Sequence, residues 1–126
     1  MRGLQVLVVE DNELNMKLFR EVLESSGHRM LEAETGGRAV ALTTEHRPDL
    51  VLMDIHLPDI DGVEALRMLR ADERTASVPV LALTAQAMEG DRERFLAAGF
   101  DGYLSKPVNI ADLLDAVRRY CEGGSR

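Results

Sequence analysis

Short runs of mostly apolar residues alternate along the chain with longer segments in which apolar residues recur every three or four positions. Runs of the first kind are typical of strands buried on both faces of a parallel sheet, and the second pattern is typical of amphipathic helices. The sequence therefore predicts five strand–helix units. The predicted strands are 4–9, 29–33, 50–53, 78–83 and 102–104, and the predicted helices are 12–26, 37–45, 62–70, 87–98 and 110–121.

Glycine and proline mark several of the predicted boundaries. Gly27 follows the first helix and Gly99 follows the fourth, where glycine readily adopts the left-handed conformation that ends helices. Pro79 lies near the start of the fourth strand, where a missing N–H donor is tolerated. The regular alternation of strands and helices predicts a single α/β domain, in which a doubly wound parallel sheet carries helices on both faces through right-handed crossovers.

Composition excludes several classes of protein. The 126 residues are 45% hydrophobic and 29% charged, as in ordinary globular domains. The formal net charge of −7 argues against nucleic-acid partners, and no apolar stretch approaches the ~20 residues that span a membrane. The single cysteine, Cys121, fits a reducing compartment, and Met1–Gly3 leaves no room for a signal peptide before the first strand. We therefore expect a cytoplasmic protein.

Polar residues follow all five predicted strands, although no role is predicted for Glu34 after the second. Glu10 and Asp11 come after the first strand, Asp54 after the third, Thr84 after the fourth and Lys106 after the fifth. The carboxyl ends of parallel strands meet at one edge of the sheet, where ligands bind. Clustered carboxylates repel one another unless they share protons or bind a hard cation, and Mg²⁺ prefers oxygen ligands. The pattern therefore predicts a magnesium site at this edge.

Asp54 is the candidate for covalent chemistry at that edge. With a metal ion compensating its charge, Asp54 can stay ionised and attack phosphorus to form an aspartyl phosphate. Lys106 would place a positive charge, and Thr84 a hydroxyl donor, against the phosphoryl oxygens. Glu10 and Asp11 also have a structural interpretation, since an acid before a helix can be its N-cap, although that role accounts for one acid and not for both.

The residues around these positions resemble bacterial response-regulator receiver domains over nearly the whole chain. Four motifs carry the resemblance in order: Val8–Asn12, Pro48–Gly62, Leu83–Ala85 and Lys106–Pro107. The segments Val9–Leu18 and Ala87–Asp91 are similar to the DivK-like single-domain response regulators. The resemblance implies a flavodoxin- and CheY-like (βα)5 fold with strand order 2-1-3-4-5. Residues 1–121 would form the receiver domain, and residues 122–126 a short flexible tail.

The resemblance also implies roles for residues at the predicted edge. Asp54 would be the phosphoacceptor, supplied by a histidine kinase or a phosphotransfer protein. The ligands of Mg²⁺ would be Glu10, Asp11, Asp54 and the backbone carbonyl of His56, with Glu10 acting mainly through a metal-bound water. Lys106 and Thr84 would stabilise the phosphate.

A switch is implied for Thr84 and Tyr103, whose movement would remodel the face formed by the fourth helix, the fifth strand and the fifth helix. The Lys106–Pro107 peptide would be cis. His56 departs from the small or amide residues often found two places after the acceptor. Two interpretations stay open for it, an exposed loop histidine or a residue that changes the lifetime of the phosphorylated state.

The leading hypothesis is a stand-alone signalling switch rather than an enzyme that turns over substrates. It would act by binding a downstream protein such as a kinase, and the resemblance implies cell-cycle or polarity control. The alternative within the same family is a receiver domain excised from a hybrid histidine kinase. Met1 and the nearby stop favour a complete protein.

Two hypotheses belong to other classes. An aspartyl-phosphate phosphatase of the dehalogenase-like kind needs a second aspartate two places after the nucleophile, where this chain has His56, and usually a cap domain, for which the chain has no room. A flavodoxin-like or Rossmann nucleotide binder would have glycines or hydroxyls after its first strand, where this chain has Glu10-Asp11-Asn12.

Overall fold

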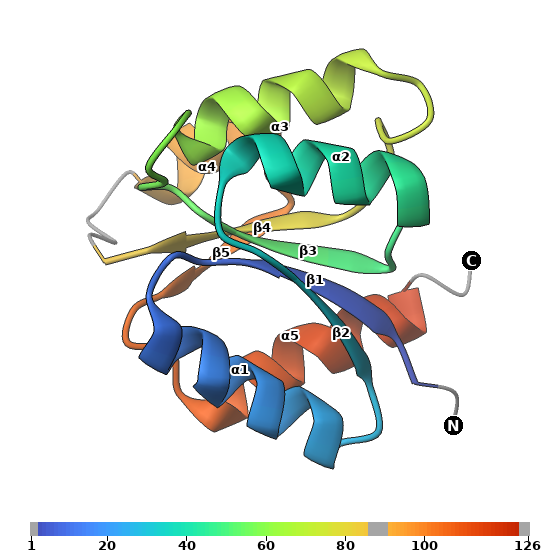
Figure 1. Ribbon diagram of the computed structural model, residues 1–126, viewed down its shortest axis with the longest axis vertical. Coiled ribbons are helices and arrows are strands. Elements are labelled where there is room, and N and C mark those ends of the chain that lie inside the picture. Colours follow the sequence, from blue (N-terminus) through green and yellow to red (C-terminus); the bar gives the residue numbers. More distant parts are fainter. Residues whose placement is uncertain (1–2, 86–90, 124–126) are drawn as a thin grey trace.

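The computed structural model describes residues 3–85 and 91–123. Five strands and five helices alternate within them (Figure 1). The strands are β1 (Gln5–Val9), β2 (Arg29–Ala33), β3 (Leu50–Asp54), β4 (Val80–Thr84) and β5 (Gly102–Ser105). The helices are α1 (Glu13–Ser25), α2 (Gly36–His46), α3 (Gly62–Ala71), α4 (Asp91–Ala98) and α5 (Ile110–Gly123).

The strands form one parallel sheet in the order β2-β1-β3-β4-β5, which confirms the predicted fold class and strand order. Helices α2, α3 and α4 cover one face of this sheet, and α1 and α5 cover the other (Figure 1). In the pairing register Val9 lies opposite Met53, and Thr84 lies opposite Ser105. The residues that follow β1, β3, β4 and β5 therefore meet at one edge.

Two hydrophobic cores hold the sheet between its helical layers. Strands β3 and β4 are buried along their whole length, as their continuous apolar runs predict. Along β3, Val51 and Met53 contribute to the core on the α2–α4 side, whereas Leu50 and Leu52 contribute to the core on the α1 and α5 side. Each such buried side chain contributes roughly 1.5–3 kcal/mol. Because a slip of one residue would exchange these two sets, packing on both faces fixes the register that places Asp54 at the edge.

Some strand boundaries differ from the predicted ones. Strand β3 includes Asp54, and β4 runs from Val80 to Thr84 instead of over 78–83. The N–H of Val78 donates to the carbonyl of Thr75 at 3.1 Å, so Val78 belongs to a turn before the strand.

Helix boundaries differ by one or two residues. Helix α2 is one residue longer at each end than predicted, and Arg47 ends it in the left-handed conformation, with φ of 45°. Helix α5 continues to Gly123, so the first two residues of the predicted tail, 122 and 123, are helical. The predicted start of the fourth helix, 87–90, lies outside the described residues.

Gly27 and Gly99 have φ of 86° and 113°, the left-handed conformation predicted for the residues after α1 and α4. In the part of the chain that the structure describes, none of the helices combines the length and the apolar character that crossing a membrane requires.

Candidate functional site

Asp54 lies at the carboxyl end of β3, and only 4% of its surface is exposed. Its two carboxylate oxygens have different partners. Oδ1 accepts a hydrogen bond from the backbone N–H of His56 at 2.9 Å, and Oδ2 accepts one from Nζ of Lys106 at 2.7 Å. The strand fixes the backbone and these two donors fix the rotation of the carboxylate, so Asp54 is held in one orientation.

Lys106 is shared between two buried acids. Its Nζ also lies 2.9 Å from Oε1 of Glu10, a side chain that is 1% exposed. This second contact is an ion pair. Burial raises the pKa of Glu10, and the neighbouring Lys106 opposes this effect. Burial alone would lower the pKa of Lys106, but the hydrogen bond to Asp54 and the contact with Glu10 outweigh it, so the pKa of Lys106 is raised.

Asp11 supplies a third carboxylate from the end of β1. One oxygen each from Glu10, Asp11 and Asp54 lie within 4.8 Å of one another. Three acids and one lysine leave an excess of negative charge at this site, and the possible metal ligands are all oxygen atoms. A hard divalent cation binds such ligands and compensates the excess charge. The residues present therefore fit Mg²⁺. His56 is the second residue of the loop after Asp54, and it is exposed.

The N-cap of α1 is Asn12, whose side chain accepts from the N–H of Asn15 at 3.0 Å. Oε2 of Glu10 accepts from the N–H of Asn12 at 3.2 Å and thus supports the turn before the helix. The capping interpretation of Glu10 and Asp11 is therefore wrong for both acids, and neither is occupied as the cap of α1.

The remaining predicted residues come from β4 and β5. Thr84 is 4% exposed, and its carbonyl accepts from the N–H of Lys106 at 2.7 Å, which joins the two strand ends at the site. Tyr103 pairs with Ala82, two residues before Thr84, and is half-buried. Its ring lies 5.9 Å from that of Phe95 in α4. The structure therefore places Thr84 at the strand end that is bonded to Lys106, and places Tyr103 against α4. The Lys106–Pro107 peptide is cis.

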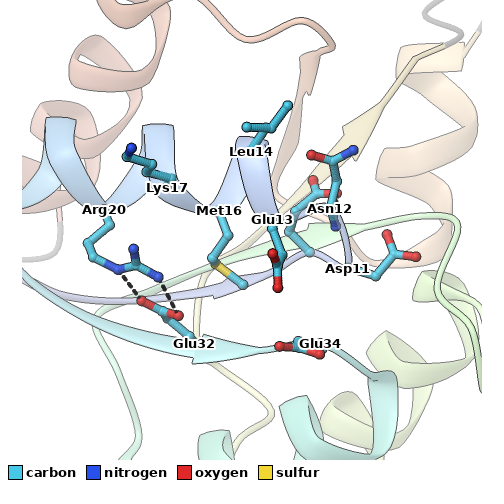
Figure 2. Close-up of a pocket in the computed structure, with 10 residues that line it drawn as sticks. Asp11, Asn12, Glu13, Leu14, Met16, Lys17, Arg20, Glu32 and Glu34 are labelled. Atoms are coloured by element: carbon cyan, nitrogen blue, oxygen red, sulfur yellow. Dashed lines mark hydrogen bonds and ion pairs between the residues drawn. The ribbon is translucent and has the colours of Figure 1, made fainter.

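A pocket of about 370 Å³ opens beside the carboxylates, between α1 and β2 (Figure 2). Glu10 and Asp11 line one end of it. At the other end Arg20 of α1 donates two hydrogen bonds to Glu32 of β2, at 2.6 and 2.8 Å. Most of the side chains that line the pocket are polar or charged.

Asp59 lies in the loop after β3, and the sequence predicted no role for it. Its carboxylate accepts from the backbone N–H groups of Gly36 and Gly37, and so connects the loop after β3 to the start of α2. The signal in the sequence is the start of this helix, Thr35-Gly36-Gly37, whose N–H groups need acceptors. Nothing in the sequence distinguishes Asp59 from Asp61 as the acid that supplies them.

Residues 6–118 match the family model for the response regulator receiver domain. The chain therefore belongs to this family. Among curated relatives it is similar to the polar-differentiation response regulator DivK of Brucella anthropi, with 45% identity over 115 residues, which cover 91% of this chain and 94% of the relative. DivK of Brucella ovis matches to the same extent.

Two solved structures extend the comparison. The receiver domain of sensor histidine kinase PA1611 from Pseudomonas aeruginosa, which has a magnesium ion coordinated in its active-site cleft, is 42% identical, with a TM-score of 0.85 and coverage of 94% of this chain and 97% of that one. The receiver domain of a Saccharomyces cerevisiae response regulator, solved with a histidine phosphotransfer signalling protein, is 29% identical, with a TM-score of 0.87 and coverage of 94% and 89%.

Proposed function

We propose that Asp54 accepts a phosphoryl group from a phosphohistidine on a histidine kinase or phosphotransfer protein, in a reaction that requires Mg²⁺. The phosphorylated chain then signals in the cytoplasm by binding another protein. One observation carries this proposal. The buried Asp54 carboxylate is held between the His56 N–H and Lys106, beside two further acids.

In the transfer, a carboxylate oxygen of Asp54 forms a bond to phosphorus, and the bond between phosphorus and the donor imidazole nitrogen breaks. The bonding electron pair leaves with the imidazole, so no external reactant is needed. Glu10, Asp11, Asp54 and the backbone carbonyl of His56 would hold the metal ion, which when bound compensates charge on the phosphoryl oxygens. Lys106 and the hydroxyl of Thr84 stabilise the same oxygens.

Thr84 and Tyr103 are the proposed switch. Thr84 lies at the site, and Tyr103 lies on the neighbouring strand with its ring against Phe95 of α4. A movement of Thr84 toward the phosphate therefore changes the packing next to Tyr103, and this change reaches α4 and the surface that it shares with β5 and α5. The protein holds phosphate as a signal, because the position two places after Asp54 is His56 and not a second acid.

The comparisons favour two settings for this switch. The 45% identity to DivK over almost the whole of both chains supports a stand-alone regulator that acts in polarity or cell-cycle control. The 42% identity to the receiver domain of a sensor histidine kinase favours the second candidate, a receiver that works within a hybrid kinase. A pull-down from cell extract with beryllofluoride-activated protein, compared with Asp54→Asn, separates the two settings. A downstream protein among the activation-dependent partners would favour the stand-alone regulator, and a phosphotransfer protein alone would favour the receiver of a hybrid kinase.

The direct test is labelling by acetyl phosphate in the presence of Mg²⁺, followed by intact-mass spectrometry. Asp54→Asn should abolish the phosphorylated species, and a chelator should abolish it in the wild type. Asp115→Asn is the matched control, since Asp115 is an exposed acid on α5 that contacts only the exposed Arg119 at 3.6 Å among the ion pairs of the described residues. Labelling retained by Asp54→Asn, or many turnovers per chain on p-nitrophenyl phosphate, would contradict the proposal.

A further inference from the structure

The loop between β3 and α3, residues 55–61, is bonded to the N-terminus of α2 by one carboxylate. Oδ1 of Asp59 accepts from the N–H of Gly36 at 2.8 Å, and Oδ2 accepts from the N–H of Gly37 at 2.9 Å. These belong to the first N–H groups of the helix, which have no acceptor within it. The N-cap Thr35 accepts from the N–H of Arg38 at 3.1 Å. Asp59 thus completes the capping of α2 from a different loop.

The two segments also fit closely. A Cβ atom on Gly36 would lie 2.5 Å from Cγ1 of Ile60, and one on Gly37 would lie 3.3 Å from Oδ2 of Asp59. Glycine at both positions therefore lets the loop approach the helix start. The N–H donors of Gly37 and Gly36 also lower the pKa of Asp59.

The position of this contact relates it to the metal site. In the strand order β2-β1-β3, the loops after β2 and β3 flank the end of β1, which carries Glu10 and Asp11. Both loops lead to helices on the same face of the sheet (Figure 1). Asp59 therefore joins the two loops that border the carboxylate cluster on that face.

The first residues of the loop contact Asp54 itself. The N–H of His56 donates to Oδ1 of Asp54 at 2.9 Å. The base of the loop is closed by the N–H of Gly62, which donates to the carbonyl of Ile55 at 2.8 Å. Near its end, Asp61 caps α3 by accepting from the N–H of Glu64 at 2.8 Å. These contacts fix both ends of the loop to β3 and α3, whereas Asp59 holds its middle to another element.

We propose that Asp59 is a positioning residue for the Asp54 site. By fixing the loop against α2, it keeps the His56 N–H on Asp54 and the His56 carbonyl in place for Mg²⁺. This inference rests on the proposed function. Asp59 touches neither the metal nor the phosphate in this account, so its loss should weaken Mg²⁺ binding by loosening the residues that do.

The test is calorimetric titration of the full chain with Mg²⁺ alone. Asp59→Ala should raise the Kd for Mg²⁺ about tenfold, since residues that support metal ligands commonly have effects of this size. Asp59→Asn keeps one acceptor oxygen and should have a smaller effect. Thr35→Ala is the matched control, because it removes the other cap of the same helix N-terminus but leaves the loop bonded to Gly36 and Gly37. It should lower the Tm and leave the Kd within about twofold of the wild type.

The titrations are made at about 1 M salt, where the screening length of about 3 Å removes the long-range effect of a lost surface charge. Hydrogen exchange at the His56 amide supplies the second readout, and it should be faster in Asp59→Ala than in Thr35→Ala. Equal Kd values for Asp59→Ala and Thr35→Ala, or equal losses in Asp59→Ala and Asp59→Asn, would overturn the inference. A wild-type chain that binds no Mg²⁺ would instead overturn the proposed function.

Discussion

The two ends of the sheet both carry charged side chains, but they differ in how fully those charges are matched. At the carboxyl end, Glu10 and Asp54 share Lys106, and Asp11 adds a third carboxylate beside them. At the amino ends of β4 and β5, Arg70 of α3 uses all three of its nitrogens. It donates to the carbonyls of Gly99, Ala76 and Val78 and to the carboxylate of Asp101.

The amino end is a completed network. Asp101 also accepts from the N–H of Val80 at 2.8 Å, so one acid satisfies both an arginine and a strand donor. The contacts of Arg70 tie α3 to the segments that lead into β4 and β5. The carboxyl end lacks such compensation, because it has more carboxylates than cations. A matched network stabilises the fold, whereas an excess of one charge creates a place for a ligand of the opposite charge.

The largest predicted effect on stability concerns Arg70, at the amino end of the sheet, where the charges are matched. Arg70→Met should lower the free energy of unfolding by about 3 kcal/mol, because it leaves several partly buried carbonyls without donors. Added Mg²⁺ should not restore this loss, and acetyl phosphate should still label the folded variant. Urea denaturation with and without Mg²⁺ measures both properties.

Arg67→Met is the control for that variant. Arg67 lies on the same helix, its side chain is 70% exposed and it pairs with Glu64. Its loss should change the free energy of unfolding by less than about 0.5 kcal/mol. If Arg70→Met also changed the free energy of unfolding by less than about 0.5 kcal/mol, the network at the amino end would contribute little to stability.

Lys106→Met tests the unmatched end. With a chelator present, the free energy of unfolding should fall by about 2 kcal/mol, because two buried carboxylates lose their cation. The effect should be smaller than for a fully buried pair, since 20% of the Lys106 side chain is exposed. Mg²⁺ should restore stability in this variant, unlike in Arg70→Met, because the metal binds the acids that lost their partner. Labelling by acetyl phosphate should become slower.

Lys17→Met, a lysine that lines the pocket on α1, is the control for Lys106→Met. Its urea midpoint should not depend on Mg²⁺ more than that of the wild type. If Mg²⁺ left the midpoint of Lys106→Met unchanged, the excess of carboxylate charge would not be the source of metal binding.

The residues at the carboxyl end were predictable from sequence because they depend on strand ends alone. Once the apolar runs are recognised as parallel strands, Glu10, Asp54 and Lys106 must meet at one edge. The strand order needed the family resemblance, since the apolar runs do not determine which strands are neighbours. The fold and its order are confirmed, but the separate role of each site residue stays a prediction until the Asp54→Asn experiment.

The contacts that depend on loop conformation were not predictable. Asp59 and Asp61 are both acids in one short segment, yet one bonds α2 and the other caps α3. Arg70 reads as an ordinary basic residue in the last turn of a helix, and its carbonyl partners come from loops that the helical pattern does not describe. The predicted first helix begins at Asn12, whereas in the structure Asn12 is the N-cap that precedes it.

The smallest predicted effect concerns a matched pair that is exposed. Arg20 and Glu32 form a bidentate pair, but their side chains are 40% and 39% exposed, so Glu32→Gln should cost only about 0.5 kcal/mol near neutral pH.

The hydrogen bond from Arg20 lowers the pKa of Glu32 below its usual 4.5. The unfolded chain therefore binds a proton more readily, and the stabilisation is present above about pH 4.5 and is lost as the pH falls through the folded pKa. Urea midpoints of the wild type and Glu32→Gln should differ at about pH 7 and converge as the pH falls through the folded pKa of Glu32. Glu45→Gln, at an acid whose side chain is 70% exposed, should show no such convergence. If the urea midpoints of the wild type and Glu32→Gln still differed at low pH, packing of the Glu32 side chain, and not its charge, would stabilise this edge of the sheet. The matching of charges alone would then not distinguish the carboxyl end of the sheet from the amino end.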